Sequence, residues 1–184
     1  RHFSDLYLCF CGLAKCEPNH SFGPGIRDNY IIHYITKGKG KYYVNNACYE
    51  LSQGQGFLVE PHLQVFYQAD KDDPWQYLWI GFNGTKAIQY LNDIGLSSNH
   101  LTFQCNYSEE LKQIVHNMLK NNNFATSNQF LLESLLYSFF SILSKDIKII
   151  NKSEDIKILG YETELIQVLI NILNNSKDAL EFSK

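Results

Sequence analysis

Apolar and polar positions along this chain follow two different periods, which divide it into two halves. From about residue 5 to 105, short apolar and aromatic runs alternate with Gly, Pro, Asn and Asp, as in NYIIHYIT, GKYYV, ACYEL, GQGFLVEP, QVFYQA, PWQYLWIGF and HLTFQC. Short runs with turn residues between them predict an antiparallel barrel or sandwich. Tight reversals are expected at 37–40, 45–47, 53–56 and 70–74, because these segments carry the residues that turns require.

From about residue 107 the spacing of apolar residues becomes helical. In YSEELKQIVHNMLKN they recur at i, i+3, i+4, i+7 and i+8, and Ser108 is the expected N-cap. The segment TSNQFLLESLLYSFFSILSKD follows and starts with a capping box of Thr126 and Gln129. Its apolar stripe is too wide for one contact, so one side should cover the barrel and the other should meet the first helix or a second subunit.

The two periods predict an α+β fold, with an antiparallel barrel followed by two or three α-helices. We expect the barrel over 1–106 and a helical region over 107–148. A linker and a third amphipathic helix, from about Glu162 to Glu181, fill 149–184. With 45% hydrophobic residues, the chain has enough apolar side chains for a packed core, as globular proteins do.

Charge and cysteine usage narrow the class of function. The net charge is −3 and the 16 Lys and Arg residues are scattered, whereas a module that holds DNA carries a basic stripe. We therefore expect no nucleic-acid binding by this segment itself. The five cysteines lack the paired CxxC spacing of a zinc site and are expected to be reduced thiols in a cytoplasmic protein. No apolar run approaches the length of a membrane span, so no membrane association is expected.

The aromatic residues of PWQYLWIGF are the first candidates for binding chemistry. Strand alternation places Trp75, Tyr77 and Trp79 on one face. Three such rings make either a large core or the floor of a wet cavity, and both interpretations stay open. Tyr and Trp combine an apolar body with a hydrogen-bonding tip, which suits the mixed faces of a sugar.

Arg27 is a second candidate, because a guanidinium presents five donors and is costly to bury unpaired. It stands just before the first strong strand. A charged hydrogen bond from it to a ligand hydroxyl would contribute about 1.5–3 kcal/mol. The alternative is a salt bridge to Asp28 or Glu60.

Histidines and nucleophiles give no catalytic pattern. His33 lies opposite Tyr30, Ile32 and Tyr34 on its strand, and a histidine in that position is more often structural than a ligand or base. The chain lacks the His-x-His pair with a following Glu that metal-binding barrels offer. No nucleophile motif or phosphate loop is present either. We expect no catalytic residue, metal or cofactor.

Four features of the barrel half, in this order along the chain, resemble one known family. They are R-D-x-Y-x-x-H-Y, the G-K-G hairpin, the strand ending in Pro61 and W-x-Y-x-W-x-x-F. The family is the N-terminal ligand-sensing domain of AraC-family transcription regulators, in the branch that controls sugar utilisation, and the resemblance covers about residues 5–148. One departure is Gln53-Gly54-Gln55, where the family has Pro-Gly-Asp. The resemblance implies a cupin-like barrel, a double-stranded β-helix, with an N-terminal arm.

The resemblance also implies a site. In arabinose-responsive members, sugar is held by residues that match Arg27, Tyr67, Tyr77 and Trp79, although Tyr77 stands where that member has a His. The predicted ligand contacts are Arg27, His33, Glu60, Tyr67, Tyr77 and Trp79, and the ligand is a small saccharide.

Partners follow from the resemblance as well. Family members dimerise through the helices after the barrel, which predicts a homodimer. The predicted dimer contacts are Leu132, Leu135, Leu136, Phe139 and Leu143. DNA is contacted by helix-turn-helix units that follow the sensor domain and are absent from this sequence.

The end of the chain, ETELIQVLINILNNSKDALE, resembles the N box of sensor histidine kinases, with Asn175 at the position of the asparagine that helps hold magnesium on ATP. The other nucleotide elements are missing, so we interpret this segment as a packing helix. Two alternatives to the sensor of a regulator stay open. One is a cupin-type isomerase or metal-dependent oxygenase using His33, Glu60 and His62, and the other is the sensor module of a histidine kinase.

Overall fold

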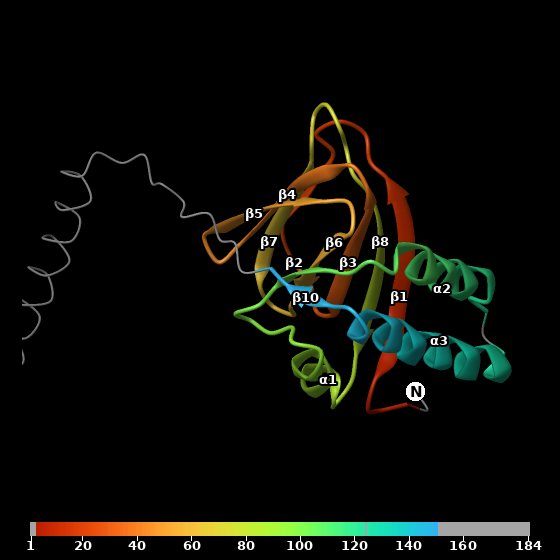
Figure 1. The fold of residues 1–184 in the computed structure, drawn as a ribbon. Helices are drawn as coiled ribbons and strands as arrows, with labels where there is room; N and C mark the ends of the chain where they lie inside the picture. The colour runs from red at the N-terminus through yellow and green to blue at the C-terminus, as the bar shows by residue number, and fades with distance from the viewer. Residues whose placement is uncertain (1–2, 124, 151–184) are drawn as a thin grey trace, which may run out of the picture. The chain divides into compact units, whose positions relative to one another are not determined.

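The computed structural model describes residues 3–123 and 125–150, which form two antiparallel sheets with helices on the outer side of one (Figure 1). The larger sheet has the order β1 (Tyr7–Lys15), β8 (Gln76–Asn83), β3 (Tyr30–Lys37), β6 (Gln55–Val59), β9 (Thr102–Gln104) and β10 (Lys148–Ile149). The smaller sheet has the order β2 (Ser21–Ile26), β7 (Gln64–Ala69), β4 (Lys39–Val44) and β5 (Ala47–Ser52). The helices are α1 (Ala87–Asp93), α2 (Ser108–Lys120) and α3 (Thr126–Ser144).

From β1 to β8 the chain crosses from one sheet to the other at every connection except the β4–β5 hairpin. This repeated crossing is the topology of a double-stranded β-helix. The predicted fold class, an α+β cupin-like barrel followed by helices, is confirmed.

The predicted reversals are present where glycine, asparagine and aspartate occur. Gly38 and Gly54 have φ angles of 70° and 83°, and Asn45 and Asn46 have 51° and 61°. Left-handed backbone is favourable for these residue types, so each position can reverse the chain tightly. In the loop before β8, the Asp70 carboxylate accepts two backbone N–H groups at 2.9 Å, which lowers its pKa.

Aromatic rings pack in one part of the space between the two sheets. The ring centroids of Tyr42 on β4 and Phe57 on β6 lie 4.4 Å apart, and Trp75 lies 6.0 Å from Phe57. All three side chains are buried. The Tyr42 hydroxyl donates to the Leu58 carbonyl oxygen at 2.9 Å, so its polar tip is satisfied inside the barrel.

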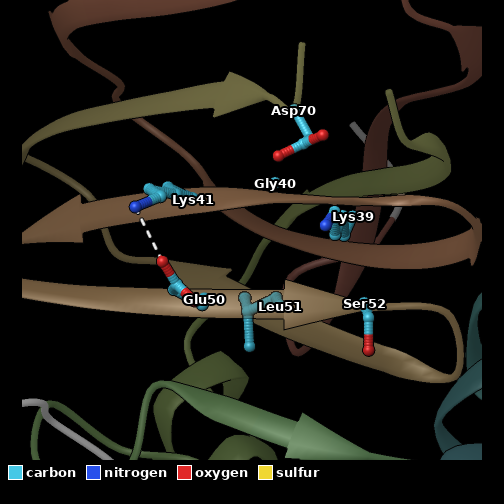
Figure 2. A pocket seen from close by; sticks show the side chains of 7 residues that line it. All are labelled: Lys39, Gly40, Lys41, Glu50, Leu51, Ser52 and Asp70. Carbon is cyan, nitrogen blue, oxygen red and sulfur yellow. Dashed lines mark ion pairs between the residues drawn. The ribbon is translucent and has the colours of Figure 1, made fainter. Parts of the chain in front are cut away.

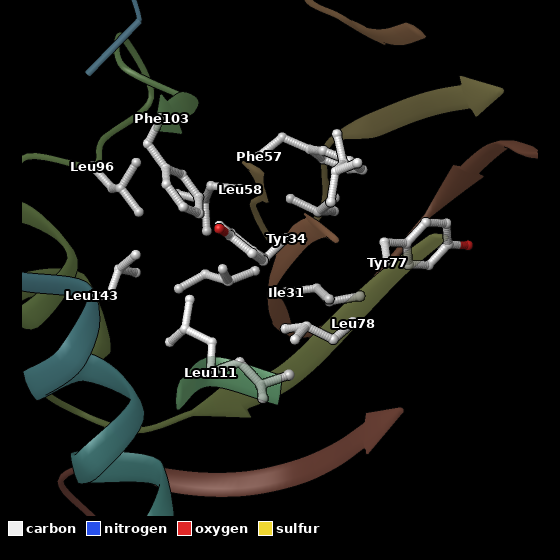
Figure 3. Packing of buried hydrophobic residues seen from close by; sticks show 14 of the residues in the cluster. Ile31, Tyr34, Phe57, Leu58, Tyr77, Leu78, Leu96, Phe103, Leu111 and Leu143 are labelled. Carbon is white, nitrogen blue, oxygen red and sulfur yellow. The ribbon is translucent and has the colours of Figure 1, made fainter. Parts of the chain in front are cut away.

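A second layer of core lies between the outer face of the larger sheet and the helices. The Tyr34 hydroxyl donates to the Cys105 carbonyl oxygen at 2.7 Å, and Phe82 meets Phe140 of α3 at 5.2 Å between ring centroids. Figure 3 shows Leu111 of α2 with Tyr34 in this layer. Strand β3 is therefore buried on both faces: all five residues from 31 to 35 are buried.

Helices α2 and α3 each begin one residue earlier than their predicted caps require. Ser108 and Thr126 are the first helical residues of α2 and α3, and Tyr107 and Ala125 occupy the cap positions without a side-chain cap hydrogen bond. A cap residue needs a non-helical backbone, which Ser108 and Thr126 do not have. The predicted N-cap at Ser108 and the capping box of Thr126 and Gln129 are therefore wrong.

Two elements do not stand out in the sequence pattern. Strand β1 pairs with β8 at the edge of the larger sheet and has a bulge between Leu8 and Phe10, which interrupts its alternation. Helix α1 has only seven residues, too few for a helical period to show.

Strand β10 pairs with β9, so the chain returns to the larger sheet after α3. The predicted third helix and Asn175 lie outside the described residues.

The wide apolar stripe of α3 packs largely inside the molecule. Leu136, Phe139 and Leu143 are 0% exposed beneath the helix, which corrects the expectation that these three meet a second subunit. Leu132 and Leu135 are half-buried at the flank of the stripe. Within the described ranges, no helix is long and apolar enough to cross a membrane.

The packing of α3 predicts that substitutions on its buried face lower the free energy of unfolding much more than substitutions on its exposed face. Replacing Phe139→Ala leaves a cavity in the core and should lower the free energy of unfolding by about 3–5 kcal/mol. The exposed control Ser141→Ala should change it by less than about 0.5 kcal/mol. Urea unfolding followed by circular dichroism measures both, and equal effects of the two changes would contradict this arrangement of α3.

Candidate ligand-binding cavity

A cavity of about 360 Å³ opens between the two sheets. Strands β1, β2, β3, β7 and β8 contribute to its walls, so both sheets position it. Its lining residues are Phe10, His20, Ser21, Phe22, Arg27, Ile31, His33, Tyr67, Tyr77 and Trp79.

One wall is built from two cross-strand pairs of glycine and an aromatic residue. Phe10 on β1 is opposite Gly81 on β8, and Gly12 on β1 is opposite Trp79 on β8. A Cβ at Gly12 would lie 2.1 Å from the Trp79 ring, and one at Gly81 would lie 2.3 Å from the Phe10 ring. Each ring therefore lies over the backbone of the partner strand. Because glycine has no side chain, both rings can pack directly against the sheet.

His33 lies on the inner wall. Its ring stacks on Phe57 at 4.5 Å and 8°, and it lies 5.1 Å from the Tyr67 ring and 5.2 Å from the Tyr77 ring. Only 3% of the residue is exposed, and its Nδ1 has no hydrogen-bond partner among the described residues. Burial, with a smaller effect of Arg27, lowers its pKa to about 3. The imidazole is therefore neutral at physiological pH.

Arg27 lies exposed at the rim of the cavity. Its guanidinium carbon lies 4.2 Å from the centroid of the Phe22 ring, and Phe22 stacks on Tyr67 at 5.0 Å. No carboxylate within the described ranges lies within 4.0 Å of Arg27, and Asp28 instead lies 3.8 Å from His62. The salt bridge considered as the alternative role for Arg27 is not formed.

The two tyrosines remain protonated and keep hydroxyl groups available. Burial raises the pKa of Tyr67 to about 12, against the opposing effect of Arg27. Burial also raises the pKa of Tyr77, with a further contribution from the neighbouring Cys16. Both hydroxyls can therefore donate as well as accept hydrogen bonds.

Glu60 is not among the lining residues, unlike the other five predicted contacts. It follows the last residue of β6 and lies beside Ser98, and burial raises its pKa. Along β6 its position alternates with that of Val59, which shares the inner side with Phe57. The prediction that Glu60 contacts a ligand in this cavity is not supported by its position.

The residues considered for a metal enzyme do not converge. His62 is exposed at the surface beside Asp28, whereas His33 is buried among rings. No group of three or more His, Cys, Asp or Glu side chains suited to a metal ion occurs in the part of the chain that the structure describes. His33, Glu60 and His62 are therefore not arranged as ligands of one metal ion.

A second hollow of about 370 Å³ lies on the β4–β5 hairpin (Figure 2). It is lined by Lys39, Gly40, Lys41, Glu50, Leu51, Ser52 and Asp70. Lys41 and Glu50 form an ion pair at 2.6 Å across its surface, so these two charges already compensate each other. It contains no aromatic ring, and we therefore take the first cavity as the candidate site.

The sequence singled out only part of this cavity. It identified Arg27, His33, Tyr67, Tyr77 and Trp79, which the fold brings together, and their roles as ligand contacts stay a prediction. The expectation that Trp75 shares a face with Tyr77 and Trp79 is confirmed, but Trp75 is core and does not line the cavity. The lining residues that were missed are Phe10, His20, Ser21, Phe22 and Ile31. Gly12, which pairs with Trp79, could have indicated that β1 forms part of the cavity wall. This pairing is known only once the register of β1 against β8 is known.

A barrel that opens into a cavity lined mainly by aromatic rings, with helices covering one of its sheets, is typical of a ligand-binding domain. Residues 8–140 match the model of the AraC-like ligand binding domain, and the chain belongs to this family.

Curated relatives are regulators of sugar operons. The Msm operon regulatory protein of Streptococcus mutans is 36% identical over 154 residues, which cover 82% of this chain and 54% of that protein. The raffinose operon regulator RafR of Pediococcus pentosaceus is 34% identical, over 72% of this chain and 50% of that protein. The lactose operon activator of Staphylococcus xylosus is 25% identical, over 94% of this chain and 61% of that protein. The chain thus spans about half the length of these relatives.

The alignment with the lactose operon activator bears on the end of the chain. Because it covers 94% of this chain, it includes part of residues 151–184. The segment that resembles a kinase N box is therefore matched in part by a transcription activator, which does not favour the kinase alternative.

The neutral state of His33 predicts a measurable dependence of stability on pH. The unfolded chain binds a proton at His33 near pH 6.5 and the folded chain only near pH 3, so stability falls as the pH drops through this window. Between pH 7 and pH 5, the wild type should lose about 2 kcal/mol more than the His33→Phe variant. Urea unfolding at both pH values measures the difference, which cancels the effect of all other groups. If the difference in stability between the wild type and the variant is the same at pH 7 and pH 5, His33 takes up its proton in the folded protein as it does in the unfolded chain.

Proposed function

We propose that this chain is the effector-binding domain of an AraC-type transcription regulator and that it binds a small saccharide in the barrel cavity. The observation that carries the proposal is the convergence of Arg27, His33, Tyr67, Tyr77 and Trp79 around one cavity. The curated relatives, named as regulators of the Msm, raffinose and lactose operons, support the ligand class.

The chemistry of the walls suits a sugar. The rings of Phe10 and Trp79 offer flat apolar surfaces to the C–H faces of a pyranose, and Arg27 and the tyrosine hydroxyls offer hydrogen bonds to its hydroxyls. A volume of about 360 Å³ lies near the lower end of the range of small-molecule sites, about 300–1,000 Å³. We therefore favour a mono- or disaccharide.

The domain binds its ligand without transforming it. The relatives, which are named as regulators, support this proposal. We propose that the rest of the full-length protein carries the DNA-binding helix-turn-helix units, in the cytosol. The net charge of −3 fits a segment that does not itself hold DNA.

A signal from the cavity has a direct route to the helices. The Leu8 N–H on β1 donates to Glu133 Oε1 on α3 at 3.3 Å, beside the bulge that precedes Phe10 of the cavity wall. Regulation of this kind requires that the sugar bind one arrangement of β1 and α3 better than the other. We propose that ligand occupancy changes the population of these arrangements.

We propose that α3 also forms a homodimer contact. Leu131 is 38% exposed, and Leu132 and Leu135 beside it are half-buried. These residues lie on adjacent turns and make one apolar strip at the flank of the buried stripe. This strip, and not the buried Leu136, is where a second subunit would dock.

Ligand binding is tested by calorimetry with the monosaccharides glucose and galactose and the disaccharides lactose and melibiose. We expect the wild type to bind at least one of them, and Arg27→Ala to bind it about 10- to 100-fold more weakly, because a charged hydrogen bond is lost. The control Lys39→Ala changes a cation of the second hollow and should leave binding unchanged. Failure of the wild type to bind any saccharide, or equal affinity of the Arg27 variant, would refute the site.

Dimerisation is tested by size-exclusion chromatography with light scattering. The chain is expected to elute as a dimer, and Leu131→Glu combined with Leu135→Glu should give a monomer, because two buried charges disfavour the contact. Ile88→Glu on α1, at another exposed apolar position, is the control and should remain a dimer. A double variant that stays dimeric would exclude this strip as the contact.

A further inference from the structure

We propose that His33 is the specificity-determining residue of the cavity and that a ring nitrogen of its neutral imidazole accepts a hydrogen bond from one ligand hydroxyl. The proposal rests on the proposed saccharide-binding function and adds how the site tells epimeric saccharides apart. It is carried by three observations: the shortage of acceptors in the cavity, the fixed position of the ring and an unpartnered buried nitrogen.

Hydrogen-bond acceptors are scarce in the cavity. None of its lining residues is Asp or Glu, and Arg27 and Trp79 can only donate from their side chains. Each hydroxyl of a sugar is a donor as well as an acceptor, so a bound sugar needs acceptors from the protein. His20 and Ser21 can also accept, but both are exposed at the mouth; the buried side-chain acceptors are a His33 nitrogen and the hydroxyls of Tyr67 and Tyr77.

The imidazole of His33 is enclosed by aromatic rings. Its backbone lies on β3 in the larger sheet, opposite Phe57 on β6 and Trp79 on β8. The ring stacks on Phe57 at 4.5 Å, and Tyr77 meets it at 76°. A ring enclosed in this way cannot follow a hydroxyl that points in another direction, whereas the exposed Arg27 can adjust.

The buried Nδ1 of His33 has no partner within the described ranges. A buried polar atom without a hydrogen bond costs stability and is rare in folded proteins. A ligand hydroxyl that reaches this nitrogen would supply the missing partner. A residue that lowers the stability of the free protein but contacts the ligand is typical of a functional site.

Two matched pairs of disaccharides test the selection. Lactose and cellobiose differ only at one hydroxyl-bearing carbon of the terminal ring, as do melibiose and isomaltose. By calorimetry, we expect the wild type to prefer one member of a pair. His33→Phe keeps the ring but loses the acceptor, so affinity for the preferred sugar should fall about 10-fold and the preference should disappear. His33→Asn restores an acceptor on a short side chain and should keep part of the preference.

Two controls separate selection from packing. Trp79→Phe should weaken binding of both members by a similar factor, because a smaller ring remains for stacking. The melting temperature of ligand-free His33→Phe should equal or exceed that of the wild type, because an unpaired nitrogen is removed. A saccharide-binding wild type whose preference survives in His33→Phe, or that has no preference, overturns the role of His33 alone. A wild type that binds none of the sugars overturns the proposed function itself.

Discussion

The structure depends on a sheet whose central strands, β3 and β8, are buried on both faces. Their side chains must alternate between two environments, the interior of the barrel and the layer beneath the helices. On β3, Tyr34 faces the helices and His33 faces the cavity, and on β8, Phe82 meets α3 and Tyr77 meets the cavity rings. Helices and cavity are therefore opposite sides of the same strands, and neither can be repacked without affecting the other.

The inner face carries more polar atoms than a core requires. The Tyr42 hydroxyl finds a carbonyl partner, as buried polar groups normally do. His33 does not, and Arg27 at the rim has an aromatic ring beneath it in place of a carboxylate. The buried Nδ1 of His33 is thus left without a hydrogen bond at the wall of the cavity, whereas the buried hydroxyl of Tyr42 in the core is satisfied.

The sequence predicted the barrel, most of its strands and the two long helices because period, turn residues and strand length are local properties. It predicted Trp79 from strand alternation and Arg27 from the cost of burying an unpaired guanidinium, whereas Tyr67 came only from resemblance to a family. Phe10 and Phe22 were missed because only the cross-strand register places them beside Trp79 and Tyr67. The buried side of α3 was misassigned for a similar reason: helical spacing identifies an apolar stripe, but not the surface that covers it.

Gly12 has a consequence for the ligand that its own position does not suggest. It does not line the cavity, yet its missing side chain is what lets the Trp79 indole lie back against β1. Any larger residue at this position would drive the indole inward and reduce the space between the sheets. The volume of the cavity thus depends on a residue that lies outside it. Replacing Gly12, which no ligand touches, would therefore change the size of ligand that fits.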